Sequence, residues 1–242
     1  MIPKVIHYCW FGRNEKNKAI CKCIDSWKKY CPDYTIIEWN EDNFDVESVP
    51  FVRDAYKAKK WAFVADYARL KIVYENGGIY LDTDVELLKS LDPFLNLNAY
   101  MGFESDGLVN TGLGFGARKG HEVLLELMKD YEARTFSADM EDLKKIACPI
   151  INTKVLENLG LEANGKQQSF CDLTVFPYEY FDPKDQQTYV LSLTDKTVSI
   201  HHYDASWKSA NTSIKQALFR TVAKIVGKDN FIKIKNTIKR NK

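Results

Sequence analysis

The sequence predicts an α/β fold with helices flanking a mixed sheet, and two observations predict it. The chain has 242 residues, 45 % of them hydrophobic, which is enough to bury the core of one such domain. Its first elements are expected to be a strand, a helix and a second strand, at about 4–8, 16–30 and 34–39. A strand–helix–strand order indicates neighbouring parallel strands.

A long helix is the next expected element. Trp61, Ala65, Ala68 and Ile72 recur at helical spacing up to about Asn76, and would line one buried face. Gly77-Gly78 should end this helix, because glycine adopts the left-handed backbone of a helix C-terminus without strain. Further elements are expected as strands at 79–81, 100–103, 113–117 and 198–202, and as a helix at 122–134.

Net charge divides the chain into a body, 1–211, and a tail, 212–242. The whole chain carries +1, which argues against a general nucleic-acid binder. The tail has nine Lys or Arg and one Asp, hence +8, which leaves −7 on the body. Apolar tail residues recur at helical spacing. Two interpretations stay open: helices packed on the body, or an amphipathic anchor on an anionic membrane surface.

The six cysteines indicate a reducing compartment. The N-terminus lacks the basic and apolar regions of a signal peptide, so reduced thiols are expected rather than disulfides. No apolar run approaches the length of a membrane span. We therefore expect a cytoplasmic protein, with peripheral attachment to the inner face of the membrane if the tail binds lipid.

Asp82-Thr83-Asp84 follows the strand expected at 79–81. Residues two apart in an extended chain point to the same side, about 7 Å apart. Two such carboxylates repel each other unless a cation lies between them, and Mg²⁺ or Mn²⁺ suits these oxygen ligands. Taken alone, such a triplet is more often a solvated acidic turn than a metal site. The neighbouring sequence must therefore distinguish the two.

Four segments supply those surroundings. They are Ile2–Trp10, Trp61–Arg69, Gly77–Val85 and His201–Trp207. In this order they resemble the DXD-motif sugar-binding glycosyltransferases, which include Och1-like mannosyltransferases, capsular-polysaccharide glycosyltransferases and the catalytic domains of large clostridial glucosylating toxins. The resemblance implies a GT-A type fold with a Rossmann-like mixed sheet. It also implies Mn²⁺ (or Mg²⁺) and retention of the donor's anomeric configuration.

The resemblance also assigns roles around the acidic pair. Asp84 matches the direct metal ligand, and Asp82 matches a residue that contacts the donor and supports the metal. Asp66 and Arg69, one helical turn apart, match residues that hold the donor sugar and phosphate, where the alternative is a surface ion pair of little value. Asn110 matches an Asn near the sugar or acceptor, although Asn-Thr-Gly is also a common turn.

The two ends of the body complete the expected site. Cys9 and Trp10 lie at the turn after the first strand, where the family's Trp stacks on the nucleobase; the alternative is core packing. Neighbouring strand residues face opposite ways, so at most one of His201 and His202 should reach the metal, and counting back from Trp207 favours His202. Ser206 and Trp207 match a loop that closes over the diphosphate and excludes water.

The expected reaction is transfer of a hexose from a nucleoside diphosphate sugar to a hydroxyl of a glycan or lipid-linked glycan, as in capsule or other surface polysaccharide synthesis. A UDP-hexose is favoured as donor, and GDP-mannose stays open. No nucleophile is evident; Glu104 and Asp106 qualify only by following a strand, so a same-face mechanism is expected. The alternatives are a non-catalytic sugar-nucleotide or lipid-binding module, and a metal-dependent nucleotidyltransferase.

Overall fold

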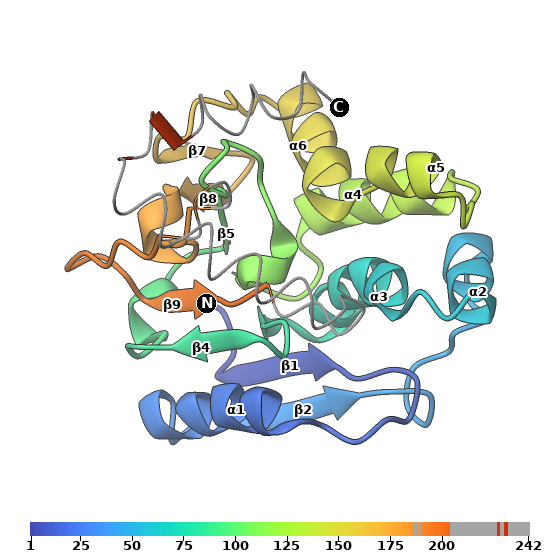
Figure 1. Cartoon of the computed structure of the whole chain (residues 1–242), viewed down its shortest axis with the longest axis horizontal. Helices are drawn as coiled ribbons and strands as arrows, with labels where there is room; N and C mark the ends of the chain where they lie inside the picture. Colours follow the sequence, from blue (N-terminus) through green and yellow to red (C-terminus); the bar gives the residue numbers. More distant parts are fainter. Residues whose placement is uncertain (186–187, 189, 204–226, 228–229, 232–242) are drawn as a thin grey trace.

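Seven strands form the main sheet, in the order β2-β1-β3-β6-β5-β8-β7 (Figure 1). The computed structural model describes residues 1–185, 188, 190–203, 227 and 230–231. β1 pairs in parallel with β2 and β3, and β5 with β8, whereas β6 runs antiparallel to β3 and β5. The predicted α/β class with a mixed sheet is confirmed. The strands are β1 (Val5–Cys9), β2 (Thr35–Trp39), β3 (Gly78–Tyr80), β5 (Ala99–Gly102), β6 (Phe115–Ala117), β7 (Gln168–Phe170) and β8 (Leu173–Phe176).

Helices cover both faces of this sheet, and a small second sheet lies beside it. The helices are α1 (Lys18–Tyr30), α2 (Pro50–Lys57), α3 (Trp61–Asn76), α4 (Glu122–Glu132), α5 (Met140–Lys145) and α6 (Cys148–Asn158). β4 (Val85–Leu87) and β9 (Ser199–His201) form an antiparallel pair next to α1 (Figure 1). The sequence did not predict α2, α5, α6, β4, β7 or β8.

The two faces of the sheet bury separate cores because side chains alternate along each strand. Tyr80 and Met101 point into the core under α2, α3, α4 and α6. Ile79 and Tyr100, their neighbours in sequence, point into the other core, which includes α1 and β4. The strands therefore read as continuous apolar runs, as expected for strands covered on both faces.

The connection from α3 to β3 positions the acidic triplet. Gly77 has φ +69° and its N–H donates to the Val73 carbonyl at 2.8 Å, which ends the helix as predicted. Gly78 has φ +109°, and a Cβ there would lie 2.9 Å from His7 Nε2 and from the Val5 carbonyl. Both positions therefore require glycine, and the chain enters β3 without an intervening loop.

Two side chains of α1 fix the strand that follows the triplet. Trp27 is fully buried, and its Nε1 donates to the Val85 carbonyl at 2.7 Å. Ser26 Oγ accepts from the Leu87 N–H at 2.9 Å. The position of β4, and with it the position of Asp84, therefore depends on α1.

Replacing Trp27 with Phe tests this anchor. Trp27→Phe removes the donor to the Val85 carbonyl, and we expect the free energy of unfolding to fall by about 1–3 kcal/mol. Urea unfolding should show a lower midpoint with an unchanged m-value. Tyr178→Phe, at a residue 44 % exposed, is the control and should stay within about 0.5 kcal/mol of the parent. An unchanged midpoint for Trp27→Phe would show that β4 does not need this bond.

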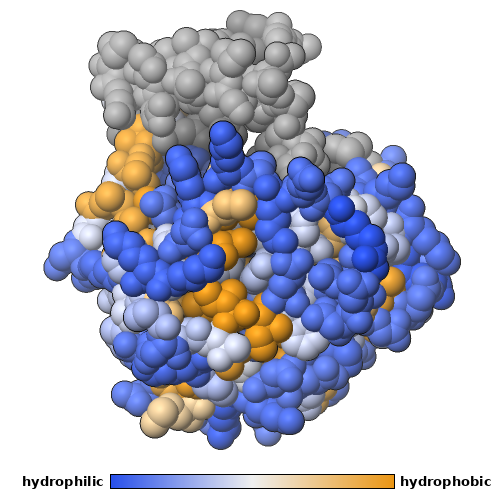
Figure 2. Space-filling view, turned by 90° about the horizontal axis from the view of Figure 1, so that it is seen from below, coloured by the Kyte–Doolittle hydropathy of each residue, from blue (hydrophilic) through white to orange (hydrophobic). Residues whose placement is uncertain are grey.

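Seen from the side on which α1 lies, the surface is mostly hydrophilic, with an apolar patch near the centre of the view (Figure 2). Among the helices in the described part of the chain, none combines the length and hydropathy needed to cross a bilayer.

Candidate functional site

Polar side chains gather where four parallel strands of the main sheet end. β1, β3, β5 and β8 all run in the same direction, so their carboxyl ends share one edge. Trp10 follows β1, Asp82 follows β3, Glu104 follows β5, and Asp182 comes shortly after β8. Ligands of open α/β sheets bind at this edge, which makes it the candidate functional site.

Three side chains at this edge could hold a metal ion. Asp82, Asp84 and His201 each offer a ligand atom, and these atoms lie within 4.8 Å of one another. His201 Nε2 is 3.1 Å from Asp84 Oδ1 and 3.9 Å from Asp82 Oδ2. Two carboxylates and an imidazole suit Mn²⁺ or Mg²⁺, and they leave coordination positions for phosphate oxygens. The donor set therefore fits the metal that the resemblance implies.

The structure replaces His202 with His201 in this cluster. β9 pairs His201 with Val85, and His202 turns the other way, with its Nε2 2.8 Å from Glu86 Oε2. The expectation that only one of the two adjacent histidines faces the carboxylates agrees with the structure, but the choice of His202 does not. The register of β9 against β4 determines which histidine faces the carboxylates. Counting residues back from Trp207 gives no information on that register.

Opposing charges lie close together in this cluster. Burial alone would lower the pKa of His201, but the carboxylates of Asp84 and Asp82 raise it to about 9. Burial raises the pKa of Asp82; the Arg69 guanidinium opposes the rise and Asp84 adds to it. With this pKa, the His201 imidazole carries a positive charge at neutral pH that is opposed by the two carboxylates.

Arg69 joins α3 to the acidic pair. One guanidinium nitrogen, Nη2, lies 2.8 Å from Asp66 Oδ1 and 3.4 Å from Asp82 Oδ1. The Arg69 side chain is 4 % exposed, and its guanidinium lies 5.1 Å from the ring centre of Tyr80. Tyr80 also donates its hydroxyl to Asp82 Oδ1 at 2.9 Å. This burial excludes a surface ion pair, so the two residues are built into the site.

A chain of contacts joins His201 to Asn110 through Tyr203 and Glu104. Asn110, 7 % exposed, accepts from the Gly112 N–H and donates from Nδ2 to Glu104 Oε1, both at 2.6 Å. The Tyr203 hydroxyl donates to the same Glu104 oxygen at 3.4 Å, and the Tyr203 ring packs edge-on against His201 at 4.1 Å. Asn110 is therefore joined to His201 through Glu104 and Tyr203, and its role near the sugar or acceptor stays a prediction.

Gly112 lets three site residues converge. A Cβ at this position would lie 2.5 Å from Asp82 Oδ2, 2.9 Å from Arg69 Nη1 and 3.0 Å from Asn110 Oδ1. Contacts below 3 Å force a displacement, and the nearest side chain, Asp82, is short and already bonded by Tyr80.

We expect Gly112→Ala to lower turnover by about 100-fold, because displacement by an ångström within a catalytic site has effects of this size. The measurement is steady-state donor turnover. Gly102→Ala is a matched comparison, because its Cβ would press at 2.7 Å on Phe181 in the core and not on Asp82, Arg69 or Asn110. If Gly112→Ala loses no more turnover than Gly102→Ala, the convergence at Gly112 is not functional.

The two residues expected at the donor's nucleotide lie in different surroundings. Cys9 is buried, and burial raises the pKa of its thiol to about 12, so it is a packing residue beside Arg69 and not a reactive one. Trp10 is half-buried, and its Nε1 donates to the Asn14 carbonyl at 2.6 Å. The same turn borders a hollow of about 340 Å³ whose walls include Tyr56 and Trp61. Nucleobase stacking in this region stays a prediction.

The sequence nominates Glu104 only as a possible nucleophile, because its burial and its bond from Asn110 cannot be predicted from the sequence. It does not nominate a second residue of this site, Asp182. Asp182 is fully buried and accepts from the Ser105 N–H at 3.1 Å. Burial raises the pKa of Asp182 to about 7, although His201 opposes the rise. Asp182 lies in an irregular segment that carries no motif.

Three predictions fall outside the described residues. Ser206 and Trp207, expected at the diphosphate, are among them. The same is true of the tail, 212–242, apart from residues 227 and 230–231, and of the domain boundary before it.

The fold and the residues at its edge define a GT-A type glycosyltransferase architecture. Residues 17–101 match the family described as glycosyltransferase sugar-binding region containing DXD motif. The match includes two of the four segments, Trp61–Arg69 and Gly77–Val85, so the predicted resemblance is confirmed for the region that carries the DXD motif.

Relatives and a solved structure agree with this family. Over 144 residues the chain is 33 % identical to inositol phosphoceramide mannosyltransferase 3 of Schizosaccharomyces pombe, covering 56 % of this chain and 39 % of that protein. Over 137 residues it is 31 % identical to a mannosyl phosphorylinositol ceramide synthase of Saccharomyces cerevisiae, covering 53 % and 35 %. The chain thus spans less than half the length of these relatives. The solved structure of the PaToxG glycosyltransferase shares the fold, with a TM-score of 0.52 at 18 % identity, over 65 % of this chain and 69 % of that one.

Proposed function

We propose that the chain is a metal-dependent glycosyltransferase that moves a hexose from a nucleoside diphosphate sugar to a hydroxyl group. The observation that carries the proposal is the convergence of Asp82, Asp84 and His201 with a buried arginine, Arg69, at the ligand-binding edge of the sheet. A lone acidic turn would not be joined to a buried guanidinium from another element.

The chemistry follows from the charge that develops on the leaving group. Breaking the anomeric bond places negative charge on the diphosphate, and a divalent ion bound by Asp82, Asp84 and His201 would supply Lewis-acid stabilisation there. Arg69 adds a fixed positive charge within 3.4 Å of Asp82, on the α3 side of the cluster. Asp66 holds the guanidinium from its other side and orients it. No separate general acid is needed for a diphosphate leaving group.

The relatives favour mannose as the transferred sugar. Both fungal proteins are named for mannosyl transfer to inositol phosphoceramide. We therefore propose GDP-mannose as the donor in preference to the UDP-hexose that the sequence around Trp10 favours. For the acceptor, we propose a lipid-linked polyol in preference to a capsular glycan. Mn²⁺ and Mg²⁺ are both consistent with the donor set.

Retention by a same-face mechanism is the stereochemical part of the proposal. In this mechanism the departing phosphate helps to deprotonate the acceptor. If a carboxylate nucleophile took part instead, Glu104 is the better placed of the two candidates, since it is buried at the site while Asp106 is exposed. Assignment of the product anomer by NMR tests retention, and an inverted linkage would contradict it.

A ligand screen followed by a turnover assay tests the proposed function. Thermal shift is measured with GDP-mannose, UDP-glucose, UDP-galactose and UDP-N-acetylglucosamine, each with Mn²⁺ and with EDTA, because a ligand that binds the folded state raises the melting temperature by mass action. Release of the nucleoside diphosphate is then followed for the donor that stabilises. Stabilisation without turnover would favour the non-catalytic module, and release of pyrophosphate would favour a nucleotidyltransferase.

Membrane attachment is a separate proposal that rests on the sequence of the tail. Liposomes with anionic lipid should co-sediment the full chain and not a version that lacks 212–242. If both versions sediment equally, the tail is not a membrane anchor, and the interpretation as helices packed on the body is favoured.

A further inference from the structure

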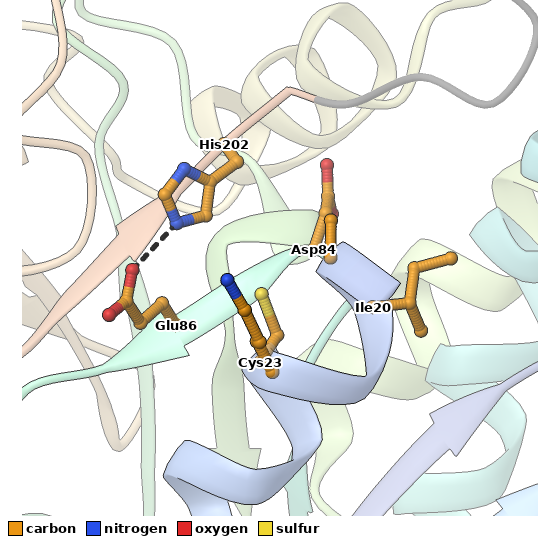
Figure 3. Close-up of a pocket in the computed structure, with 7 residues that line it drawn as sticks. Ile20, Cys23, Asp84, Glu86 and His202 are labelled. Carbon is orange, nitrogen blue, oxygen red and sulfur yellow. Dashed lines mark hydrogen bonds and ion pairs between the residues drawn. The ribbon is translucent and has the colours of Figure 1, made fainter. Parts of the chain in front are cut away.

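A hollow of about 190 Å³ lies between the first turns of α1 and the β4–β9 pair, directly beside Asp84 (Figure 3). Asp84 is thus shared by the hollow and by the cluster with His201. We propose that this hollow is the acceptor subsite, and that it binds a hydroxyl-rich six-membered ring, a hexose or a cyclitol. The inference rests on the proposed function and specifies its second substrate.

The walls of the hollow offer the two kinds of contact that a polyol ring requires. Figure 3 shows the His202 ring next to Glu86 on one side, with Cys23 of α1 facing them, and Ile20 of α1 also lines the hollow. Glu86 Oε2 is 2.8 Å from His202 Nε2, which leaves the other carboxylate oxygen to accept from hydroxyls. Charge-assisted bonds of this kind are strong. Ile20 and Cys23 give the C–H face of a ring an apolar surface.

The exposure of the Glu86–His202 pair is suited to a ligand that enters and leaves. Their side chains are 41 % and 35 % exposed, so the pair can exchange water for hydroxyl groups without opening the fold. Hydrogen bonds hold the backbone around the pair. The His202 N–H donates to the Asp84 carbonyl at 3.0 Å, and Trp27 and Ser26 hold β4 from the α1 side. A preorganised frame lowers the entropic cost of binding a small ring.

Charge and size separate this hollow from the place of the donor. Glu86, which is not part of the metal cluster, contributes a carboxylate to it, and this charge would repel a diphosphate but not a neutral polyol. A cavity of about 150 Å³ holds a benzene molecule, so this volume suits one ring and not a nucleotide with its sugar. Arg69, the buried cation suited to phosphate, contacts the cluster through Asp82 instead. Lys22, at the hollow, could contact an anionic group attached to the acceptor ring.

Filling the hollow from the exposed start of α1 tests the proposal. Ala19 lines the hollow and is exposed, so Ala19→Trp should obstruct it without disturbing the core. Lys18→Trp places the same side chain one residue earlier, at an exposed position that does not line the hollow, and is the matched control. Glu86→Gln is a second variant that keeps the shape and removes the carboxylate charge. Circular dichroism and thermal melting establish that each variant is folded.

Binding is measured on the full chain without any donor, by saturation-transfer difference NMR with methyl α-D-mannopyranoside and, separately, myo-inositol. We expect at least one of the two to give ring-proton signals with the parent chain and with Lys18→Trp. We expect these signals to disappear in Ala19→Trp and to weaken in Glu86→Gln. The two probes distinguish a hexose from a cyclitol. Absence of signal for both probes with the parent chain, or undiminished signal in Ala19→Trp, would overturn the proposal.

A kinetic readout separates this inference from the proposed function. With the donor identified by thermal shift, the ratio of sugar transferred to sugar hydrolysed should fall at least about tenfold in Ala19→Trp relative to Lys18→Trp. A rise in the donor KM at an unchanged ratio would assign the hollow to the donor and overturn the inference. If the parent chain binds the polyol but turns over no donor, the proposed function is contradicted, whereas the inferred polyol site is supported.

Discussion

Asp84→Asn is expected to lower metal-dependent donor turnover by at least about 1,000-fold. Asparagine keeps the size of the side chain but loses the charge that would bind the metal and hold His201 at 3.1 Å. Stabilisation of the leaving diphosphate depends on that metal, and loss of such electrostatic stabilisation has effects of this order. The measurement is nucleoside diphosphate release with Mn²⁺, at saturating donor, for the variant and the parent.

Two comparisons give this result its meaning. Glu157→Gln removes one carboxylate from the exposed surface of α6, far along the chain from the cluster, and should leave turnover within about twofold of the parent. The parent chain in EDTA should fall to the level of Asp84→Asn, because both lack the same ion. If Asp84→Asn keeps a tenth or more of the parent's activity, Asp84 does not hold the catalytic metal.

The part of the site that could be predicted lies within one local stretch of sequence. Helical periodicity ending at Gly77-Gly78 places α3 and β3 within a residue of their observed bounds. Helix spacing also places Asp66 and Arg69 on one face. These signals depend on the spacing of residues that are close in sequence, so they can be recognised from the sequence alone. Their burial does not follow from spacing, and an exposed ion pair would have the same pattern.

The part that could not be predicted depends on contacts between distant segments. Whether His201 or His202 faces Asp84 depends on which of them pairs opposite Val85, more than a hundred residues earlier in the chain. A shift of one residue in that pairing would exchange the two histidines between the cluster and the Glu86 side. Asp182 is brought to the site by the parallel pairing of β8 with β5. Short strands such as β4 and β9 carry too few residues to show a pattern.

This pairing has a consequence for metal binding. Because Asp84 and Asp82 raise the pKa of His201 to about 9, the imidazole is protonated at neutral pH, and a protonated imidazole cannot bind a metal. Binding must therefore release close to one proton from His201. Below the pKa, each unit of pH costs about a factor of ten in apparent metal affinity. We expect the affinity for Mg²⁺ to rise by nearly 100-fold between pH 6.5 and pH 8.5.

Isothermal titration calorimetry measures both the affinity and the released proton, the latter from the dependence of the heat on the ionisation enthalpy of the buffer. His201→Gln should bind more weakly and should lose most of the pH dependence, since the titrating group is gone. His202→Gln should keep the steep dependence, because His202 lies against Glu86 and not against the cluster. If instead His202→Gln removes the pH dependence of the metal affinity and His201→Gln does not, the metal ligand is His202, as counting back from Trp207 predicts. In that case the β4–β9 pairing would have to differ in the metal-bound protein.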